Sequence, residues 1–278
     1  TLHDMWLYCG AEHYTYENDR FVNGYLENNR PSNETGFDLN RWVWNRKKKN
    51  LPEKMNIIAT SDWQFKNAKK SYLLKDKTIH KLPLPINTNF WKPIEKNEAR
   101  KILGWDLNKI YFLFGFSSYD KKYIKGLDIS LDIFESFKNQ NPEKNVILNI
   151  FGNVQKNNFN INNVHLLGEI NDLNRLKLIY SASDLLLNTS RLESFGQIAL
   201  ESLSCNLPVV VINESGTSDL ILNKNMGFKF NQNMNEFNKW FLDIYPNIKK
   251  NNLHTEIEKK FSYQVIGKSY EKFFEDYL

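Results

Sequence analysis

The sequence predicts an α/β protein built on a doubly wound parallel sheet, and three observations lead to this class. From residue 56 onward, short apolar runs rich in Val, Ile and Leu alternate with helix-like segments. The runs lack alternating polar residues, which is typical of parallel strands covered by helices on both faces. A proline-rich stretch, "LPLPINTNFWKPIEKNE" at 82–98, interrupts the series and predicts a domain boundary.

The part before this boundary predicts a strand, a helix and a second strand after an irregular start. Residues 1–55 are aromatic and irregular, and a strand is expected at 56–60. Ser61 then caps a helix, and Gln64 at the third position completes a capping box. The second strand is expected at 79–82.

The part after the boundary predicts a regular series of elements. Strands are expected in five apolar runs, at 110–116, 145–152, 164–168, 184–188 and 208–212. Helices are expected in six segments, at 96–103, 127–138, 172–181, 197–204, 217–222 and 235–244. A last helix is indicated by apolar residues at helical spacing, which are Val265, Ile266, Tyr270, Phe273, Phe274 and Tyr277.

Composition limits the class of protein further. Hydrophobic residues make up 41% of the 278 and charged residues 25%, which is typical of a globular chain with room for two domains. No apolar run approaches the ~18 residues that span a bilayer, and no signal-peptide pattern opens the chain. Cys9 and Cys205 stand in no metal or redox spacing, so a cytoplasmic location is expected. The charge of +5 lies on scattered lysines, which argues against a nucleic-acid partner.

The stretch "SRLESFGQIALESL" at 190–203 joins an expected strand to an expected helix at the carboxyl edge of the sheet. Gly196 lets the backbone approach a ligand, and the first N–H groups of the helix attract anions such as a diphosphate. Glu193 and Glu201 flank this turn, the second about 7 Å along the helix axis from Gly196. Each carboxylate can accept hydroxyl hydrogen bonds, one from a sugar and one from a ribose. The alternative is that Glu193 is solvated and Glu201 pairs with a lysine.

The surroundings of the two carboxylates carry a resemblance to a known family. Residues 190–221 resemble the signature of the retaining glycosyltransferases of family 4, the glycosyl transferases of group 1, which have the GT-B fold. The matching residues are Ser190, Glu193, Phe195, Gly196, Glu201, Pro208 to Val210, Gly216 and Ile221. Asn188 and Asn206 stand where the family has proline and glycine, and neither position carries chemistry.

The resemblance covers almost the whole chain and implies its domain plan. A C-terminal Rossmann-like domain at 89–262 would bind the nucleotide-sugar, and residues 1–88 would be the later part of a second Rossmann-like domain. A helix at 263–278 would pack back on the N-terminal domain. The chain opens with "TLHDMW", without Met, at an expected strand end. We therefore expect it to be the later part of a longer protein.

The resemblance also implies three catalytic residues, His3, Glu193 and Lys125. His3 matches a histidine near the anomeric carbon of the donor, and Glu193 would orient the transferred sugar. Lys125 matches a lysine that grips the diphosphate. The family arginine beside it is absent here, so Lys121 or Lys122 would substitute, as a point charge instead of a planar fork. The alternative for this loop is a solvated lysine cluster.

Further residues are implied to bind the donor. Glu201 would hold the ribose, and "VHLLGEIN" at 164–171 resembles the segment whose backbone contacts the nucleobase. The whole donor-binding set is Glu201, Phe195, Gly196, Ser194, Lys122, Gly168 and Leu167. His13 and Tyr14 resemble a Gly-x-x-His-Tyr stretch of the family, from which no role follows.

Several familiar motifs are missing from the sequence. No Asp-x-Asp occurs, so no carboxylate pair is available for a metal-bound diphosphate, and no metal or cofactor is expected. No two glycines stand two residues apart, which excludes the Gly-x-Gly-x-x-Gly fingerprint. The nucleotide-sugar is thus expected as a substrate.

The function implied is transfer of a sugar from a nucleoside diphosphate to an acceptor hydroxyl with retention, in bacterial surface polysaccharide or lipopolysaccharide synthesis. The acceptor would be a glycan or a lipid-linked glycan. Two alternatives stay open, a non-catalytic nucleotide-sugar binder and a GT-B UDP-sugar epimerase. "RWVWNRKKKN" at 41–50 reads either as a contact with the inner face of the cell membrane or as a solvated basic helix end.

Overall fold

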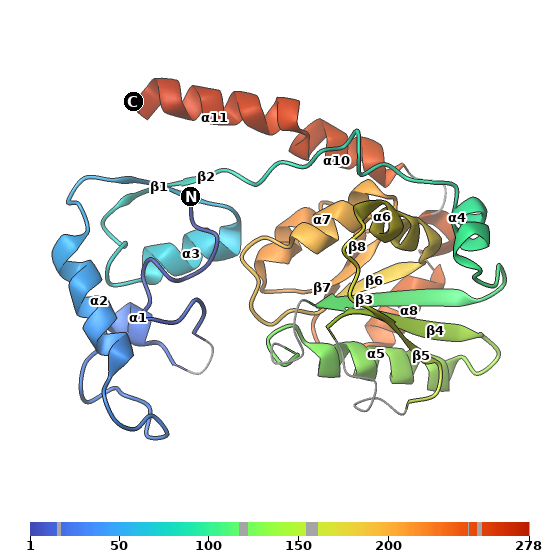
Figure 1. Cartoon of the computed structure of the whole chain (residues 1–278), viewed down its shortest axis with the longest axis horizontal. Helices are drawn as coiled ribbons and strands as arrows, with labels where there is room; N and C mark the ends of the chain where they lie inside the picture. Colours follow the sequence, from blue (N-terminus) through green and yellow to red (C-terminus); the bar gives the residue numbers. More distant parts are fainter. Residues whose placement is uncertain (16–17, 117–121, 154–160, 244, 249–251, 278) are drawn as a thin grey trace. The chain divides into compact units, whose positions relative to one another are not determined.

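The structure is a computed structural model that describes residues 1–15, 18–116, 122–153, 161–243, 245–248 and 252–277. The chain divides into two compact units, and Figure 1 shows the elements of each. The first unit comprises Thr1–Leu84, Leu192–Phe195 and Ile266–Leu278, and the second comprises Pro85–Arg191 and Gly196–Val265. The domain limits expected from the sequence stay predictions.

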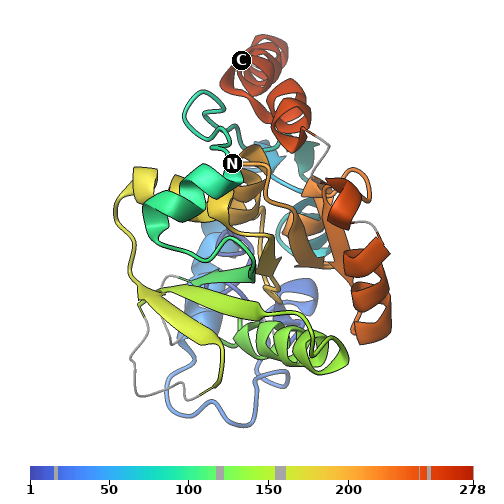
Figure 2. The ribbon, with the colours of Figure 1, turned by 90° about the vertical axis from the view of Figure 1, so that its right-hand side faces the viewer.

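The second unit is built on a six-stranded sheet with the order β5-β4-β3-β6-β7-β8 (Figures 1 and 2). The strands are β3 (Ile110–Phe116), β4 (Val146–Gly152), β5 (Val164–Gly168), β6 (Leu185–Asn188), β7 (Val209–Ile212) and β8 (Gly227–Phe230). Every neighbouring pair is parallel. The chain runs outward from β3 in one direction and from β6 in the other, which confirms the predicted doubly wound sheet.

Helices cover both faces of this sheet (Figure 1). One layer contains α4 (Lys96–Leu103), α6 (Leu173–Ala182), α7 (Gln197–Ser204) and α10 (Leu253–Phe261). The other layer contains α5 (Leu127–Gln140) and α8 (Met234–Asp243). The 3₁₀ helix η3 (Gly216–Leu220) follows β7, and α9 (Tyr245–Ile248) follows α8.

Phenylalanine rings fill the space between β3 and the layer of α5 and α8. Phe112 lies 5.3 Å from Phe137 between ring centroids, and Phe137 lies 4.9 Å from Phe241. All three side chains are buried. Such rings bury large apolar areas and prefer tilted or edge-on contacts, so they fix the helices against the strand.

The first unit contains a small parallel sheet. Strand β1 (Asn56–Ala59) pairs with β2 (Thr78–Lys81), and Leu2 forms a further parallel bridge with Ala59. Helix α3 (Asp62–Lys70) packs on both strands, and its Gln64 N–H donates to Ser61 Oγ at 3.1 Å. The predicted cap is thus confirmed. The reciprocal half of the capping box is wrong, because the Gln64 side chain donates instead to the carbonyl oxygen of Asp4.

Three more helices belong wholly or largely to this unit, α1 (Arg20–Asn23), α2 (Leu39–Asn50) and α11 (Tyr263–Tyr277). The α11 rings of Phe273 and Tyr277 lie 4.9 and 4.5 Å from the His80 ring of β2. Tyr8, Tyr25 and Trp44 belong to the apolar cluster at the centre of the unit.

Six elements differ from the prediction. Helices α1 and α2 lie in the stretch at 1–55 that was expected to be irregular, apart from the basic helix end that is one interpretation of residues 41–50, and β8, α9 and α10 were not predicted. The expected helix at 217–222 is the 3₁₀ turn η3. A 3₁₀ turn forms there because the segment is too short for α-helical bonds to propagate.

Candidate functional site

The carboxyl edge of the sheet in the second unit holds the loops after β3 and β6. The two strands are neighbours, and the strand order reverses between them. At such a reversal the chain leaves adjacent strands toward opposite faces, so the loops diverge and leave a crevice where ligands bind. The segment after β3 leads to α5, and the segment after β6 leads to α7.

A glycine with a left-handed backbone opens each of these helices. Gly126 precedes α5 with φ 70°, and Gly196 precedes α7 with φ 93°. A Cβ on Gly126 would lie 2.0 Å from the Thr189 carbonyl oxygen, and one on Gly196 would lie 2.5 Å from Thr217 Cγ2. Glycine carries no side chain to cap the first N–H groups. Both helices therefore present a positive dipole end to an anion, although the Leu127 N–H of α5 already donates to the Lys122 carbonyl.

Backbone and side-chain bonds tie the two loops together. Thr189 Oγ1 donates to the Gly126 carbonyl at 2.7 Å, and the Arg191 N–H donates to the Ile124 carbonyl at 2.8 Å. Arg191 Nη1 also donates to Asp128 Oδ1 at 2.7 Å. Arg191 thereby neutralises an acidic residue in the first turn of α5. Its role was missed in the sequence, although it lies inside the matched signature.

The predicted cations lie on the loop before α5. Lys125 is half-buried and Lys122 is exposed, and the Lys122 carbonyl accepts the Leu127 N–H at 3.0 Å. Lys121 lies outside the described residues, as do Ser117 and Ser118, which stand where the family arginine is expected. The loop thus brings Lys125 next to the first turn of α5.

Glu201 lies on α7 one turn after Gly196 and is largely enclosed. Tyr180 Oη donates to Glu201 Oε2 at 3.2 Å, and Gln197 Nε2 donates to Oε1 at 3.4 Å. Burial raises the pKa of Glu201 from 4.5 to about 7, against the opposing effect of these two hydrogen bonds. Its partners are therefore neutral groups, in contrast to the lysine of the alternative interpretation.

Thr217, at the carboxyl edge of the sheet, was expected from the sequence only as the first residue of a helix. It is fully buried, and within the described part of the chain its Oγ1 has no hydrogen-bond partner. A buried hydroxyl without a partner is costly, and a ligand oxygen would satisfy it. Its contact with the Gly196 position places it at the start of α7.

Gly168 and Leu167 end the edge strand β5 at the same carboxyl edge. Gly168 has φ 73°, and among the described residues no atom beyond its chain neighbours lies within 4 Å of where its Cβ would be. Leu167 is half-buried. The segment therefore offers open backbone, as expected for a nucleobase contact.

The remaining predicted residues belong to the first unit, which includes Leu192–Phe195. Ser194 Oγ donates to the His3 carbonyl and lies 3.2 Å from Tyr14 Oη, while Ser61 Oγ donates to the Ser194 carbonyl at 2.6 Å. His3 is exposed, Glu193 is half-buried, and Phe195 is 4% exposed. The predicted site residues thus belong to two units, and the contacts described here join residues within one unit.

His13 and Asp4 form a second polar pair in the first unit. His13 Nδ1 lies 2.5 Å from Asp4 Oδ2. A carboxylate in this position fixes the imidazole orientation and leaves the other ring nitrogen for a hydroxyl. The pair could be found in the sequence only as a partial family match.

The described residues contain neither a cluster of metal-ligating side chains nor a helix that could span a membrane. No three His, Cys, Asp or Glu side chains among them come together as a metal site. No helix in the part of the chain that the structure describes is long and apolar enough to cross a membrane.

A doubly wound sheet with two glycine-capped helix ends at its switch point is typical of Rossmann-type α/β domains, a class in which many members bind nucleotides. The comparisons with known proteins agree with this class. The chain belongs to the family of glycosyl transferases group 1, whose profile matches residues 95–259.

Relatives support the family and the fold. The chain is 28% identical over 178 residues to the mannosylfructose-phosphate synthase of Agrobacterium fabrum, covering 58% of this chain and 38% of that one. The structure of WaaG, a glycosyltransferase involved in lipopolysaccharide biosynthesis, matches 82% of this chain and 66% of its own with TM-score 0.65 and 19% identity. The structure of Anabaena HepE in complex with UDP-glucose matches 84% and 67%, with TM-score 0.65 and 17% identity. These matches confirm the predicted GT-B fold, and the chain spans 38% of the curated relative's length.

Proposed function

We propose that this chain takes part in transferring a hexosyl group from a nucleoside-diphosphate sugar to an acceptor hydroxyl, with retention, as in family 4. The observation that carries the proposal is the pair of glycine-capped helix N-termini, at Gly126 and Gly196, beside the reversal of strand order. The bound UDP-glucose in the HepE structure supports a nucleotide-sugar as the ligand.

Stabilisation of the leaving diphosphate is the main catalytic effect in this proposal. Breaking the bond between the sugar and the diphosphate leaves negative charge on the phosphate oxygens. The first N–H groups of α5 and α7, the Lys125 ammonium group and the Thr217 hydroxyl would receive that charge. The fold already orients the helix ends, so these groups need little rearrangement when the charge develops in the transition state. No metal or other cofactor enters the proposal.

The carboxylates and the histidines would orient the rest of the donor and the acceptor. Glu201 would accept hydrogen bonds from the ribose hydroxyls, and Glu193 and His3 would hold the transferred sugar. The open backbone at Gly168 would contact the base. His13, fixed by Asp4, would position an acceptor hydroxyl.

The acceptor and the cellular setting form a separate part of the proposal. We infer a glycan or lipid-linked glycan acceptor, in bacterial surface polysaccharide or lipopolysaccharide synthesis on the cytoplasmic side of the cell membrane. The involvement of WaaG in lipopolysaccharide biosynthesis supports this setting. Fold similarity alone does not determine a substrate, so the acceptor requires its own assay.

Calorimetric titration with UDP- and GDP-sugars tests the division of roles between the two carboxylates. Glu201→Ala should weaken nucleotide binding roughly tenfold or more, because it removes the hydrogen bonds between its carboxyl group and the ribose hydroxyls. Glu193→Ala should mainly lower turnover in a transfer assay. Glu258→Ala, an exposed residue of α10, is the matched control and should change neither quantity. Unchanged nucleotide affinity in the Glu201 variant would contradict the assignment.

Product analysis separates transfer from the alternatives. Transfer consumes donor only when an acceptor is present, apart from slow hydrolysis. An epimerase would instead convert a UDP-sugar into its isomer with no acceptor, and a pure binder would do neither.

A further inference from the structure

Three large apolar side chains are exposed close together in the first unit. Phe37 is 71% exposed, Leu39 is 51% exposed and Trp42 is 46% exposed. The rings of Phe37 and Trp42 meet edge to face at 6.4 Å between centroids, and the Leu39 N–H donates to the Phe37 carbonyl at 3.0 Å. We call these three residues the Phe37–Trp42 patch. Contiguous exposed apolar groups of this kind mark interaction surfaces.

Helix α2 adds positive charge to the same face. It carries five basic residues and no acidic residue, in the sequence "LNRWVWNRKKKN". The Arg46 guanidinium lies 4.8 Å from the centroid of the Trp42 ring, and Trp42, Arg46 and Lys49 line one surface hollow. Both cations are exposed. The patch and the charges therefore form one amphipathic face.

The other basic residues of α2 point to other partners. Lys47 Nζ donates to the carbonyls of Cys9 at 3.1 Å and Gly10 at 2.6 Å, and Lys48 Nζ donates to Tyr72 Oη at 3.2 Å. Trp44, two residues after Trp42, is 3% exposed and belongs to the core of the unit. The two tryptophans of "RWVW" thus differ in role, since one anchors the helix and the other is presented to solvent.

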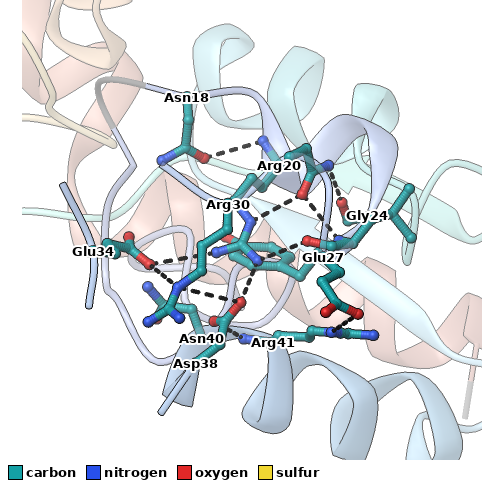
Figure 3. Close-up of polar contacts among 12 residues, drawn as sticks. Asn18, Arg20, Gly24, Glu27, Arg30, Glu34, Asp38, Asn40 and Arg41 are labelled. Atoms are coloured by element: carbon teal, nitrogen blue, oxygen red, sulfur yellow. Dashed lines mark hydrogen bonds and ion pairs between the residues drawn. The ribbon is translucent and has the colours of Figure 1, made fainter. Parts of the chain in front are cut away.

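A buried arginine, Arg20, binds Asp38, the residue that follows Phe37 (Figure 3). Arg20 Nη2 donates to Asp38 Oδ2 at 2.7 Å and to the Leu26 carbonyl at 3.2 Å. Asp38 Oδ1 accepts the Arg41 N–H at 2.8 Å, so the same carboxylate caps α2. On the other side of Phe37, Arg30 Nη1 donates to the Gly36 carbonyl at 2.8 Å, so this network preorganises the patch.

The network also neutralises the acidic residues of the loop (Figure 3). Glu34 lies within 3.6 Å of Arg20 and of Arg30, and Glu27 lies 3.2 Å from Arg41. These pairs reduce the repulsion that acidic groups would exert on an anionic partner. Arg46 and Lys49 then determine the sign of the field at the patch.

We propose that the Phe37–Trp42 patch, with Arg46 and Lys49, docks the chain on an anionic lipid bilayer. Aromatic rings favour the interfacial zone of a membrane, and each nearby Lys or Arg contributes attraction to anionic headgroups. A nucleic acid would use the charges but would gain little from three exposed apolar side chains. An acidic protein partner would leave the chain unbound to lipid vesicles, an outcome that would overturn the proposal. The docking surface is independent of the proposed transferase activity, since it uses none of the donor-binding residues.

Vesicle sedimentation of the full 278-residue chain tests the docking surface. The chain should bind vesicles of phosphatidylglycerol mixed with phosphatidylcholine, and bind phosphatidylcholine alone at least tenfold more weakly. Phe37→Ser combined with Trp42→Ser, and separately Arg46→Glu combined with Lys49→Glu, should each reduce binding at least tenfold. The matched controls lie in the second unit: Ile102→Ser, at a residue that is 61% exposed, and Lys259→Glu with Lys260→Glu on α10.

The outcomes separate the proposal from its rivals. Circular dichroism and nucleotide affinity establish that each variant keeps its fold, and neither should change. Equal binding of the wild type to both vesicle types would overturn the proposal. The same holds if the apolar variant and the charge variant both bind the vesicles as tightly as the wild type does. Loss of binding in the charge variant alone would also overturn it, since that result indicates a general polyanion site.

Discussion

At Glu201 a carboxyl group lies mostly out of water with two neutral hydrogen-bond partners. Burial raises its pKa from 4.5 to about 7. Between these values the folded chain keeps a proton that the unfolded chain has lost, so rising pH favours unfolding. The contribution of Glu201 to the free energy of unfolding should be fully present below about pH 4.5 and fall by up to about 3 kcal/mol by pH 7.

The variant Glu201→Gln isolates this effect. Urea unfolding of the wild type and the variant at about pH 5 and about pH 8 gives the difference between them at each pH, in which other titrations cancel. The wild type should lose stability relative to the variant as the pH rises. A difference that is independent of pH would mean that the carboxyl group is solvated.

Other residue roles were only partly readable in the sequence. Glu201 could be placed near the helix start from its spacing, but its neutral partner Tyr180 is 21 residues earlier in the chain. Thr217 lies against Gly196 only because η3 folds beside α7. Such contacts arise from tertiary packing, which leaves no local pattern.

Among the elements, the loop between β3 and α5 depends on Gly126. Gly126→Ala would place a Cβ 2.0 Å from the Thr189 carbonyl oxygen, on a backbone with φ 70°. Gly104→Ala is the matched control, because its φ is 69° but no atom lies within 4 Å of its Cβ position. The control should lose about 1 kcal/mol of unfolding free energy from backbone strain alone.

Gly126→Ala should lose at least about 2 kcal/mol more than the control, because the backbone of one loop must move. Urea unfolding measures both losses. Equal losses in the two variants would show that the loops after β3 and β6 are not packed as described.

Elements with strong apolar runs were predictable, and elements with mixed surfaces were not. The strand at 110–116 and the helices at 96–103 and 197–204 were predicted with the limits that the structure has. Strand β8 was missed because its four residues, "GFKF", include an exposed lysine at a sheet edge. Helix α2 was expected only as the basic helix end that is one interpretation of residues 41–50, because Trp44 is the single buried position among its polar residues.

For the whole molecule, the fold class followed from the order of runs and breaks along the chain. The strand order did not, because pairing depends on contacts between distant segments. That order is what places the starts of α5 and α7 on either side of the point where the strand order reverses in the second unit. The proposed function rests on that arrangement, together with the family.

Hydrogen exchange measured with and without a saturating nucleoside diphosphate tests this claim most directly. The ligand should be UDP or GDP, whichever raises the melting temperature. Amide exchange should slow at Gly196–Ile198, where the start of α7 would donate to the diphosphate, and in the loop at Lys122–Leu127, which the ligand would hold in place. Slowed exchange confined to other parts of the chain would contradict the account. The residues that line the cavity at Lys96, Cys205 and Tyr245 are one such part.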